Sequence, residues 1–286
     1  MQHGEPSRTA WGAAAHRAAH QVLDGGQVFA DPLATRVVGP HLEAILADAR
    51  AHPQKALLRR FIAVRHRFGE DALVRRVASG TEQVVVLGAG LDTVAYRRAA
   101  GVDGVVAGPR VFEVDHPATQ GWKHTVLAEA RVVVPSGVTY VPVDFETQDL
   151  SFELAAAGFD ASAPAFFLWL GVVPYLTPQA VRDTLRRIAA VPGAAVVFDY
   201  ANPVESLGER ARSYHQRRAE RVRALGEPFR TYLDTDRLAA ELAALGLPVV
   251  ADLGPQDIAV RYFGVRADSA GPGRSGGHVV LATAQD

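Results

Sequence analysis

Short apolar runs alternate with longer stretches of mixed composition through the second and larger part of the chain. Such runs predict buried strands, the first beginning at Val84 and the others being Val111 to Val114, Thr139 to Asp144, Ala165 to Leu170, Ala194 to Tyr200, Val249 to Leu253 and His278 to Thr283. The stretches between several of them favour helices, namely Pro117 to Ala130, Asp149 to Ala157, Pro178 to Ala190 and Thr235 to Leu245. Strands that alternate with helices predict an α/β fold with a parallel sheet covered on both faces.

The last two strands break this alternation. Only a loop rich in Gly and Pro, Gly254 to Gly277, separates them, and it shows no clear helix. We therefore expect these strands to pair as an antiparallel hairpin at the end of the sheet, so that the last of seven strands runs in reverse.

Before the first strand the chain reads as helical. Residues 7–50 show alanines at helical spacing, with a turn at Asp31-Pro32, and a second helical stretch covers 56–78. A charged, arginine-rich helical segment also follows the fifth strand. We expect a single domain over residues 1–286, with a helical cap at 1–80, a core sheet at 81–202 and 229–286, and a lid at 203–228.

Composition narrows the functional classes. With 286 residues, 48% of them hydrophobic, the chain can bury one large core. Its 30 basic and 31 acidic residues give no net charge of the kind that binds nucleic acid, so we expect a small-molecule substrate. Cysteine is absent, which excludes thiolate metal sites, and we expect no metal. No membrane span or signal peptide is indicated, so the expected location is cytoplasmic.

The first strand runs into a glycine-rich turn, and the second ends in a carboxylate. Gly88 and Gly90 lie where backbone N–H groups face outward at the start of a helix. Asp115, at the end of the next strand, can accept hydrogen bonds from the two hydroxyls of a ribose. Together they favour a cofactor that contains a nucleoside, although a lone G-x-G also occurs in turns that bind nothing.

The third position of the turn indicates which cofactor. A dinucleotide site uses G-x-G-x-x-G, but the third glycine is absent from this turn, and Asp92 would repel a diphosphate. S-adenosyl-L-methionine has no phosphate and carries a cationic sulfur, which an acidic neighbour favours. We therefore expect this cofactor rather than NAD.

Other strand ends carry further candidates. Asp144 and Phe145 suit an adenine, through a carboxylate that accepts from its amine and an aromatic side chain that packs on its ring, although Asp144 could equally cap a turn. His116 is more typical of a helix cap than of a base. Candidates on the substrate side are Tyr200 and Asn202 for positioning, and Tyr175, Arg261 and Tyr262 for binding.

Several motifs occur together in a recognisable order. They are LGAGLDTVAYRR, FEVDHPATQGWK, VPVDFETQDL, FFLWLGVVPYLT and VVFDYANP. From about Arg8 to the C-terminus the chain resembles the leucine carboxyl methyltransferase family, and most of all an actinobacterial branch associated with secondary metabolism. The resemblance implies the class I methyltransferase fold and dependence on S-adenosyl-L-methionine.

The resemblance also implies roles for individual residues. It assigns cofactor binding to Gly88, Asp115 and the pair Asp144-Phe145. It implies that Arg65 grips the carboxylate of the cofactor, with Arg17 as a second basic group. Two positions depart from the pattern, because Leu170 stands where a glutamate is usual and Val94 where an arginine or threonine is common.

Three function classes follow from these observations. The favoured one is an O-methyltransferase that acts on a carboxyl or hydroxyl group of a small metabolite. The second is a protein with the methyltransferase fold but no transferase activity, such as a cofactor-binding or cyclase-like protein, which the departure at Leu170 favours. The third is an NAD(P)-dependent oxidoreductase, which the missing third glycine opposes.

Overall fold

A seven-stranded sheet organises the protein. The computed structural model describes residues 6–99, 108–266 and 276–284. The seven predicted strands are all present, as β1 (Gln83–Leu87), β2 (Arg110–Asp115), β3 (Val138–Pro142), β4 (Ala165–Trp169), β5 (Ala195–Ala201), β6 (Val249–Leu253) and β7 (Gly277–Thr283). The predicted α/β fold with a seven-stranded sheet is thereby confirmed.

The order of the strands is β3-β2-β1-β4-β5-β7-β6. Strand β1 pairs in parallel with both β2 and β4, so the chain builds the sheet outward from β1 in two directions. In such a sheet a crevice opens beyond the carboxyl ends of the two strands where the order reverses. The ends of β1 and β4 are that place here.

The reversed last strand is confirmed, but its connection differs from the prediction. β7 lies between β5 and β6 and is antiparallel to both. The stretch expected to lack a clear helix contains α11 (Pro255–Phe263). Its start and stop signals are present in the sequence: Pro255 at the first turn, the Asp257 carboxylate accepting from the Gly254 N–H, and Gly264 at a φ of +63° after the last turn. The prediction was wrong because these Gly and Pro residues resemble those of a loop.

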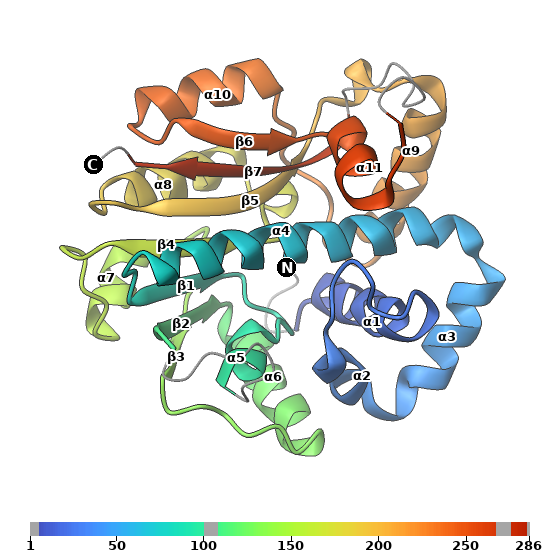
Figure 1. Ribbon diagram of the computed structural model, residues 1–286, viewed down its shortest axis with the longest axis horizontal. Coiled ribbons are helices and arrows are strands. Elements are labelled where there is room, and N and C mark those ends of the chain that lie inside the picture. The colour runs from blue at the N-terminus through green and yellow to red at the C-terminus, as the bar shows by residue number, and fades with distance from the viewer. Residues whose placement is uncertain (1–5, 100–107, 267–275, 285–286) are drawn as a thin grey trace.

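Helices cover both faces of the sheet (Figure 1). Side chains alternate between faces along each strand, so Val85 packs with α7 (Leu150–Ala156), α8 (Pro178–Ala189) and α10 (Thr235–Ala244). Val84 packs on the opposite face with α4 (Ala56–Ala78), α5 (Val94–Ala99) and α6 (Pro117–Glu129). The resulting three layers leave the ends of the strands free to carry a site.

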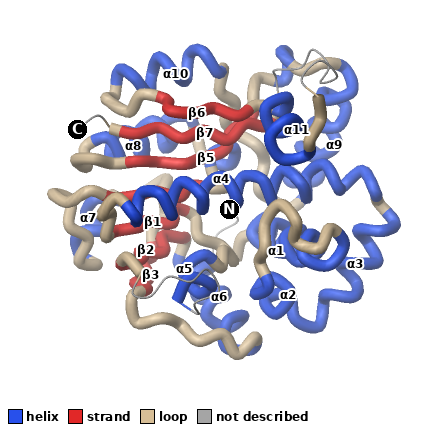
Figure 2. Tube along the Cα trace, viewed as in Figure 1, coloured by secondary structure: helices blue, strands red, loops and turns tan. Residues whose placement is uncertain are grey.

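Further helices stand beside the carboxyl ends of the strands. They are α1 (Arg8–Leu23), α2 (Pro32–Val38), α3 (Leu42–Ala51) and α9 (Glu209–Ala224), with short 3-10 turns at Gly39–His41, Pro53–Lys55, Val173–Tyr175 and Val204–Ser206. Helix α4 connects the helices α1, α2 and α3 to the sheet. Its early part contacts α1, and its later part packs on the strands (Figure 2). Among the described helices, none is long and apolar enough to cross a membrane.

One ion pair is buried between the sheet and α6. Glu113 on β2 is fully buried, and the Lys123 ammonium lies 2.7 Å from its carboxylate. The Tyr96 hydroxyl donates to the same carboxylate at 2.9 Å. Burial raises the pKa of Glu113, and Lys123 opposes that rise. The carboxylate therefore depends on these two partners.

Replacing Lys123 by Met should destabilise the fold by about 3–5 kcal/mol, because it leaves a buried carboxylate without its cation. Chemical denaturation measures this loss. The control is Arg187→Met, which breaks an exposed pair with Asp149 and should cost about 0–1 kcal/mol. Equal losses in the two variants would contradict the account.

Candidate functional site

A cavity of about 590 Å³ opens at the carboxyl ends of β1 and β4. The loop after β1 and the ends of β2, β3 and β4 form its floor. Helices α1, α4 and α9 supply the remaining walls. All seven residues predicted to hold the cofactor line this cavity: Arg17, Arg65, Gly88, Gly90, Asp115, Asp144 and Phe145. The structure thus brings together groups that are far apart in the sequence.

The glycine-rich turn needs its glycines for two reasons. Gly88 and Gly90 have φ angles of +65° and +42°, a region that side chains disfavour. A Cβ on Gly88 would also lie 2.3 Å from a methyl group of Val172. In the same turn, Asp92 accepts from the Val94 N–H at 2.7 Å and so begins α5. Gly88 and Gly90 also line the cavity, so the backbone of the turn forms part of its floor.

Asp115 supports the turn and also lines the cavity. One carboxylate oxygen accepts from the Gly90 N–H at 2.5 Å, and the other accepts from the His116 N–H at 2.7 Å. Burial raises the pKa of Asp115, and these two N–H groups oppose that rise. A carboxylate offers about four acceptor positions, so each oxygen can accept a further hydrogen bond. His116 lines the cavity too, and its ring accepts from the Ala118 N–H as the cap of α6.

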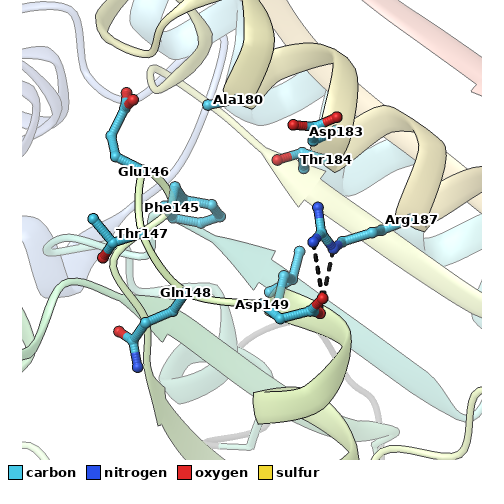
Figure 3. A pocket seen from close by; sticks show the side chains of 10 residues that line it. Phe145, Glu146, Thr147, Gln148, Asp149, Ala180, Asp183, Thr184 and Arg187 are labelled. Carbon is cyan, nitrogen blue, oxygen red and sulfur yellow. Dashed lines mark hydrogen bonds and ion pairs between the residues drawn. The ribbon is translucent and has the colours of Figure 1, made fainter.

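Asp144 and Phe145 lie just beyond β3. Asp144 accepts from the Glu146 N–H at 3.0 Å, so it forms the predicted turn while it also lines the cavity. Phe145 packs against the core and lines both this cavity and a smaller neighbouring pocket of about 290 Å³. Figure 3 shows that smaller pocket, where Arg187 pairs with Asp149 at 3.0 Å. The two readings of Asp144, turn and ligand contact, are compatible.

Arg65 on α4 is held in place by an ion pair, but not all of its N–H donors have a hydrogen-bond partner in the described part of the chain. Its Nη1 donates to Asp199 at 3.0 Å, and Asp199 also accepts from the Gly171 N–H at 2.5 Å. Gly171 has a φ of +77°, and a Cβ there would lie 2.5 Å from the Arg65 guanidinium. The buried Nε of Arg65 has no hydrogen-bond partner among the described residues. The guanidinium therefore keeps donors available beside the cavity.

Arg17 plays a different part. Its Nε donates to Asp31 at 2.9 Å, and its Nη2 donates to the Leu91 carbonyl at 2.5 Å. Asp31 caps α2, so Arg17 connects α1, α2 and the glycine-rich turn. It lines the cavity, but two of its nitrogens serve this connection.

Not all the predicted substrate residues reach the cavity. Tyr175 does, whereas Tyr200 and Asn202 do not, and neither do Arg261 and Tyr262. The alternation along β5 explains Tyr200, because its hydroxyl bonds to Asp252 at 2.5 Å on the face opposite to that of Asp199.

Asn202 and Arg261 are likewise engaged elsewhere, and the Arg261 guanidinium lies over the ring of Tyr262, 5.5 Å from its centroid. The Asn202 amide donates to the Leu233 carbonyl at 3.1 Å. Arg261 lies over the ring of Phe68, 5.8 Å from its centroid. These contacts are structural, and we assign none of the three a role in the site.

Comparison with known proteins places the chain in a family. The family model described as leucine carboxyl methyltransferase matches residues 10–189. The chain belongs to the leucine carboxyl methyltransferase family. The matched region contains the glycine-rich turn, Arg65 and Asp115, and it ends before β5 and α9.

Two curated relatives are similar to part of the chain. One, from Bacillus subtilis (strain 168), is named "Putative S-adenosyl-L-methionine-dependent methyltransferase YktD" and is 32% identical over 203 residues, covering 70% of this chain and 65% of the relative. Another, "Putative S-adenosyl-L-methionine-dependent methyltransferase FRAAL3718" from Frankia alni (strain DSM 45986 / CECT 9034 / ACN14a), is 37% identical over 175 residues, covering 58% of each chain. The alignments thus span less than two thirds of the length of these relatives.

A solved structure shows the same fold. The crystal structure of a putative methyltransferase from Thermobifida fusca YX aligns with a TM-score of 0.55 and 19% sequence identity. The alignment covers 100% of this chain and 97% of that one. Because the alignment covers the whole of this leucine carboxyl methyltransferase family member, it includes the helices outside the sheet as well as the sheet itself.

The sequence did not single out several residues that line the cavity. They are His16, His66, Arg218, Glu227 and, at the start of α1, Ser7 and Thr9. His66 lies within 3.4 Å of Asp92, and its other ring nitrogen is buried without a partner among the described residues. A weak signal existed for His66, since it follows Arg65 in the motif VRHRFGEDAL. Arg218 and Glu227 lie in the expected lid at 203–228, but nothing in the local pattern marked either of them, or His16, Ser7 and Thr9, individually.

Glu227 fastens the start of α1 over the cavity. Its carboxylate accepts from the Arg8 N–H at 2.7 Å, from the Ser7 hydroxyl at 3.0 Å and from the Thr9 N–H at 3.2 Å, and the Thr9 hydroxyl also donates to it. Glu227 follows α9 directly and is buried. This clasp joins two cavity walls that are more than two hundred residues apart in the chain.

Replacing Glu227 by Ala should loosen both walls, because at least three charge-assisted hydrogen bonds are lost, each worth about 1.5–3 kcal/mol before compensation by water. Hydrogen exchange should accelerate at the first turns of α1 and at the end of α9, with little change in β1 and β4. The matched control is Glu220→Ala, an exposed position on α9. Unchanged exchange at α1 in Glu227→Ala would contradict the clasp.

Proposed function

We propose that the chain is an S-adenosyl-L-methionine-dependent O-methyltransferase that acts on a carboxyl, or alternatively a hydroxyl, group of a small metabolite. The observation that carries the proposal is one cavity that contains both Arg65, with donors to spare, and Asp115, with acceptor positions to spare. Membership of the leucine carboxyl methyltransferase family supports it.

The residues of the cavity fit the parts of this cofactor. Asp115 would accept from the ribose hydroxyls, and Asp144 with Phe145 would hold the adenine. The free donors of Arg65 would bind the α-carboxylate, because a guanidinium matches a carboxylate with two parallel hydrogen bonds. Gly88 and Gly90 allow close approach of the backbone. When bound, the cofactor supplies an electrophilic methyl group on a cationic sulfur.

The task left to the protein is alignment and exclusion of water. Methyl transfer is an in-line displacement, so its rate depends on how closely the acceptor oxygen faces the methyl group. Helices α1 and α9, joined by Glu227, would close the cavity over the reacting groups. Tyr175, which also lines the cavity, would contact the acceptor.

A carboxyl acceptor suits this cavity better than a hydroxyl acceptor. A carboxylate is ionised at neutral pH and needs no base, whereas an alcohol or phenol does. Burial lowers the pKa of both His16 and His66, so neither imidazole is tuned to take a proton near pH 7. Leu170, where the family pattern has a glutamate, adds only apolar surface to the cavity.

A fold that binds the cofactor without transferring its methyl group is the second candidate, and Leu170 is the observation that favours it. Product analysis after incubation with S-adenosyl-L-methionine labelled on its methyl group separates the two candidates. Transfer of the label to small carboxylic acids supports the enzyme, whereas binding without transfer to any acid or alcohol supports the second.

Calorimetry with S-adenosylhomocysteine tests the cofactor assignment. The wild type should bind it and should not bind NAD. Asp115→Ala should lose about 1.5–3 kcal/mol of binding free energy per ribose hydrogen bond. Asp149→Ala, in the neighbouring smaller pocket, is the control and should bind as the wild type does. Unchanged affinity in folded Asp115→Ala would refute the ribose contact.

The role of Arg65 can be tested with a shortened ligand. Arg65→Lys keeps the charge but loses the paired donors, so S-adenosylhomocysteine should bind about tenfold more weakly. Methylthioadenosine, which lacks the amino-acid carboxylate, should bind with nearly unchanged affinity. If both ligands lose equally, Arg65 serves the fold alone.

A further inference from the structure

The cavity extends beyond the residues assigned to the cofactor. Its outer part lies between α1, the first turns of α4 and the second half of α9. Small residues on α1, Gly12 and Ala13, leave space there, and apolar side chains face it: Leu58, Ile62, Val222 and Leu225. This part has room and apolar surface for an acceptor molecule.

His16 on α1 lines this outer part among cations. Four cationic side chains act on it electrostatically: Arg218, Arg59, Lys55 and Arg65. Burial first, and then these charges in that order, lower the pKa of His16 to about 4. The imidazole is therefore neutral at pH 7, and it adds no charge to the cluster.

Three of these four cations are already paired with carboxylates. The pairs are Arg59 with Asp24 at 2.7 Å, Lys55 with Asp48 at 2.5 Å and Arg65 with Asp199 at 3.0 Å. Arg218 on α9 differs from them. Within the described parts of the chain no carboxylate forms an ion pair with it, and its guanidinium lies over the ring of Phe229, 5.5 Å from the centroid. Its charge is left uncompensated beside the cavity.

Nearby carboxylates are engaged elsewhere. Glu227 accepts from Ser7, Arg8 and Thr9 in the clasp. Asp92 accepts from the Val94 N–H and lies beside His66. A half-buried guanidinium without a counter-ion, in the same cavity as an imidazole with no hydrogen bond of its own among the described residues, favours an anionic ligand.

We propose that Arg218 and His16 form a subsite that binds an anionic group of the acceptor, with the guanidinium supplying charge and the neutral imidazole a hydrogen-bond donor. The inference rests on the proposed methyltransferase function and adds two specificity-determining residues to it. The acceptor is then an amphipathic organic anion whose apolar part packs on α1, α4 and α9. Both residues lie outside the groups assigned to the cofactor.

Binding of three matched probes tests the subsite. Benzoate and benzenesulfonate carry a negative charge on an apolar ring, and benzamide is their neutral counterpart. At pH 7 and low ionic strength, with S-adenosylhomocysteine bound, the two anions should bind wild-type protein about tenfold more tightly than benzamide. They should also shift the ring signals of His16 in NMR spectra, assigned through His16→Gln, whereas benzamide should not.

Arg218→Gln should reduce the anion-to-amide affinity ratio to about threefold or less while the affinity for S-adenosylhomocysteine stays unchanged. The matched control is Arg217→Gln, the exposed neighbour on α9, which should keep the wild-type ratio. Equal binding of the anions and benzamide to the wild type, or equal effects of the two substitutions, would overturn the subsite.

The same series is measured without S-adenosylhomocysteine. Failure of the protein to bind S-adenosylhomocysteine would refute the proposed function. The ratio of the affinity for the anions to the affinity for benzamide would still test Arg218 and His16 in that case. A ratio near one in both conditions refutes the subsite alone. A loss of all binding in Arg218→Gln, benzamide included, would show a structural role instead and would also overturn it.

Discussion

The ion pair between Arg65 and Asp199 is the contact on which the site depends. It joins α4, which carries the helical cap, to β5 in the middle of the sheet, and through the Gly171 N–H it also holds the end of β4. Both partners are buried, so loss of either would leave an uncompensated charge. Because Asp199 orients the guanidinium, Arg65 meets the cavity with its remaining donors in a defined direction. A group that supports the fold is thereby available for a ligand.

Buried charges recur where the cap meets the glycine-rich turn. Arg17 reaches Asp31 and the Leu91 carbonyl, and Arg97 on α5 bonds to Glu70 on α4. Charged pairs of this kind contribute little net stability compared with apolar packing, but they are favourable only when the two groups hold a defined distance and orientation. Here they hold the helices of the cap in a defined position relative to the glycine-rich turn and to α5.

The proposed site draws on two parts of the chain. The region that matches the family model, residues 10–189, contains the glycine-rich turn and the proposed cofactor groups. Helix α9 lies beyond it, although it forms a cavity wall together with α1. The proposed acceptor subsite combines His16 on α1, inside the matched region, with Arg218 on α9, outside it, and specificity resides in the groups that face the acceptor.

The sequence by itself determined the strands, most of the helices and the position of the floor of the cavity. Apolar runs, glycines and the carboxylates at strand ends are local signals, so the strands, the turn at Gly88 and the placement of Asp115 follow from them. Tertiary structure decided which side chains face the cavity. Tyr200 and Asp199 are adjacent, yet alternation along β5 sends one into the core and the other to Arg65. Likewise, His16 and Arg218 line one cavity although two hundred residues separate them, and no local pattern records an arrangement formed only when distant segments pack.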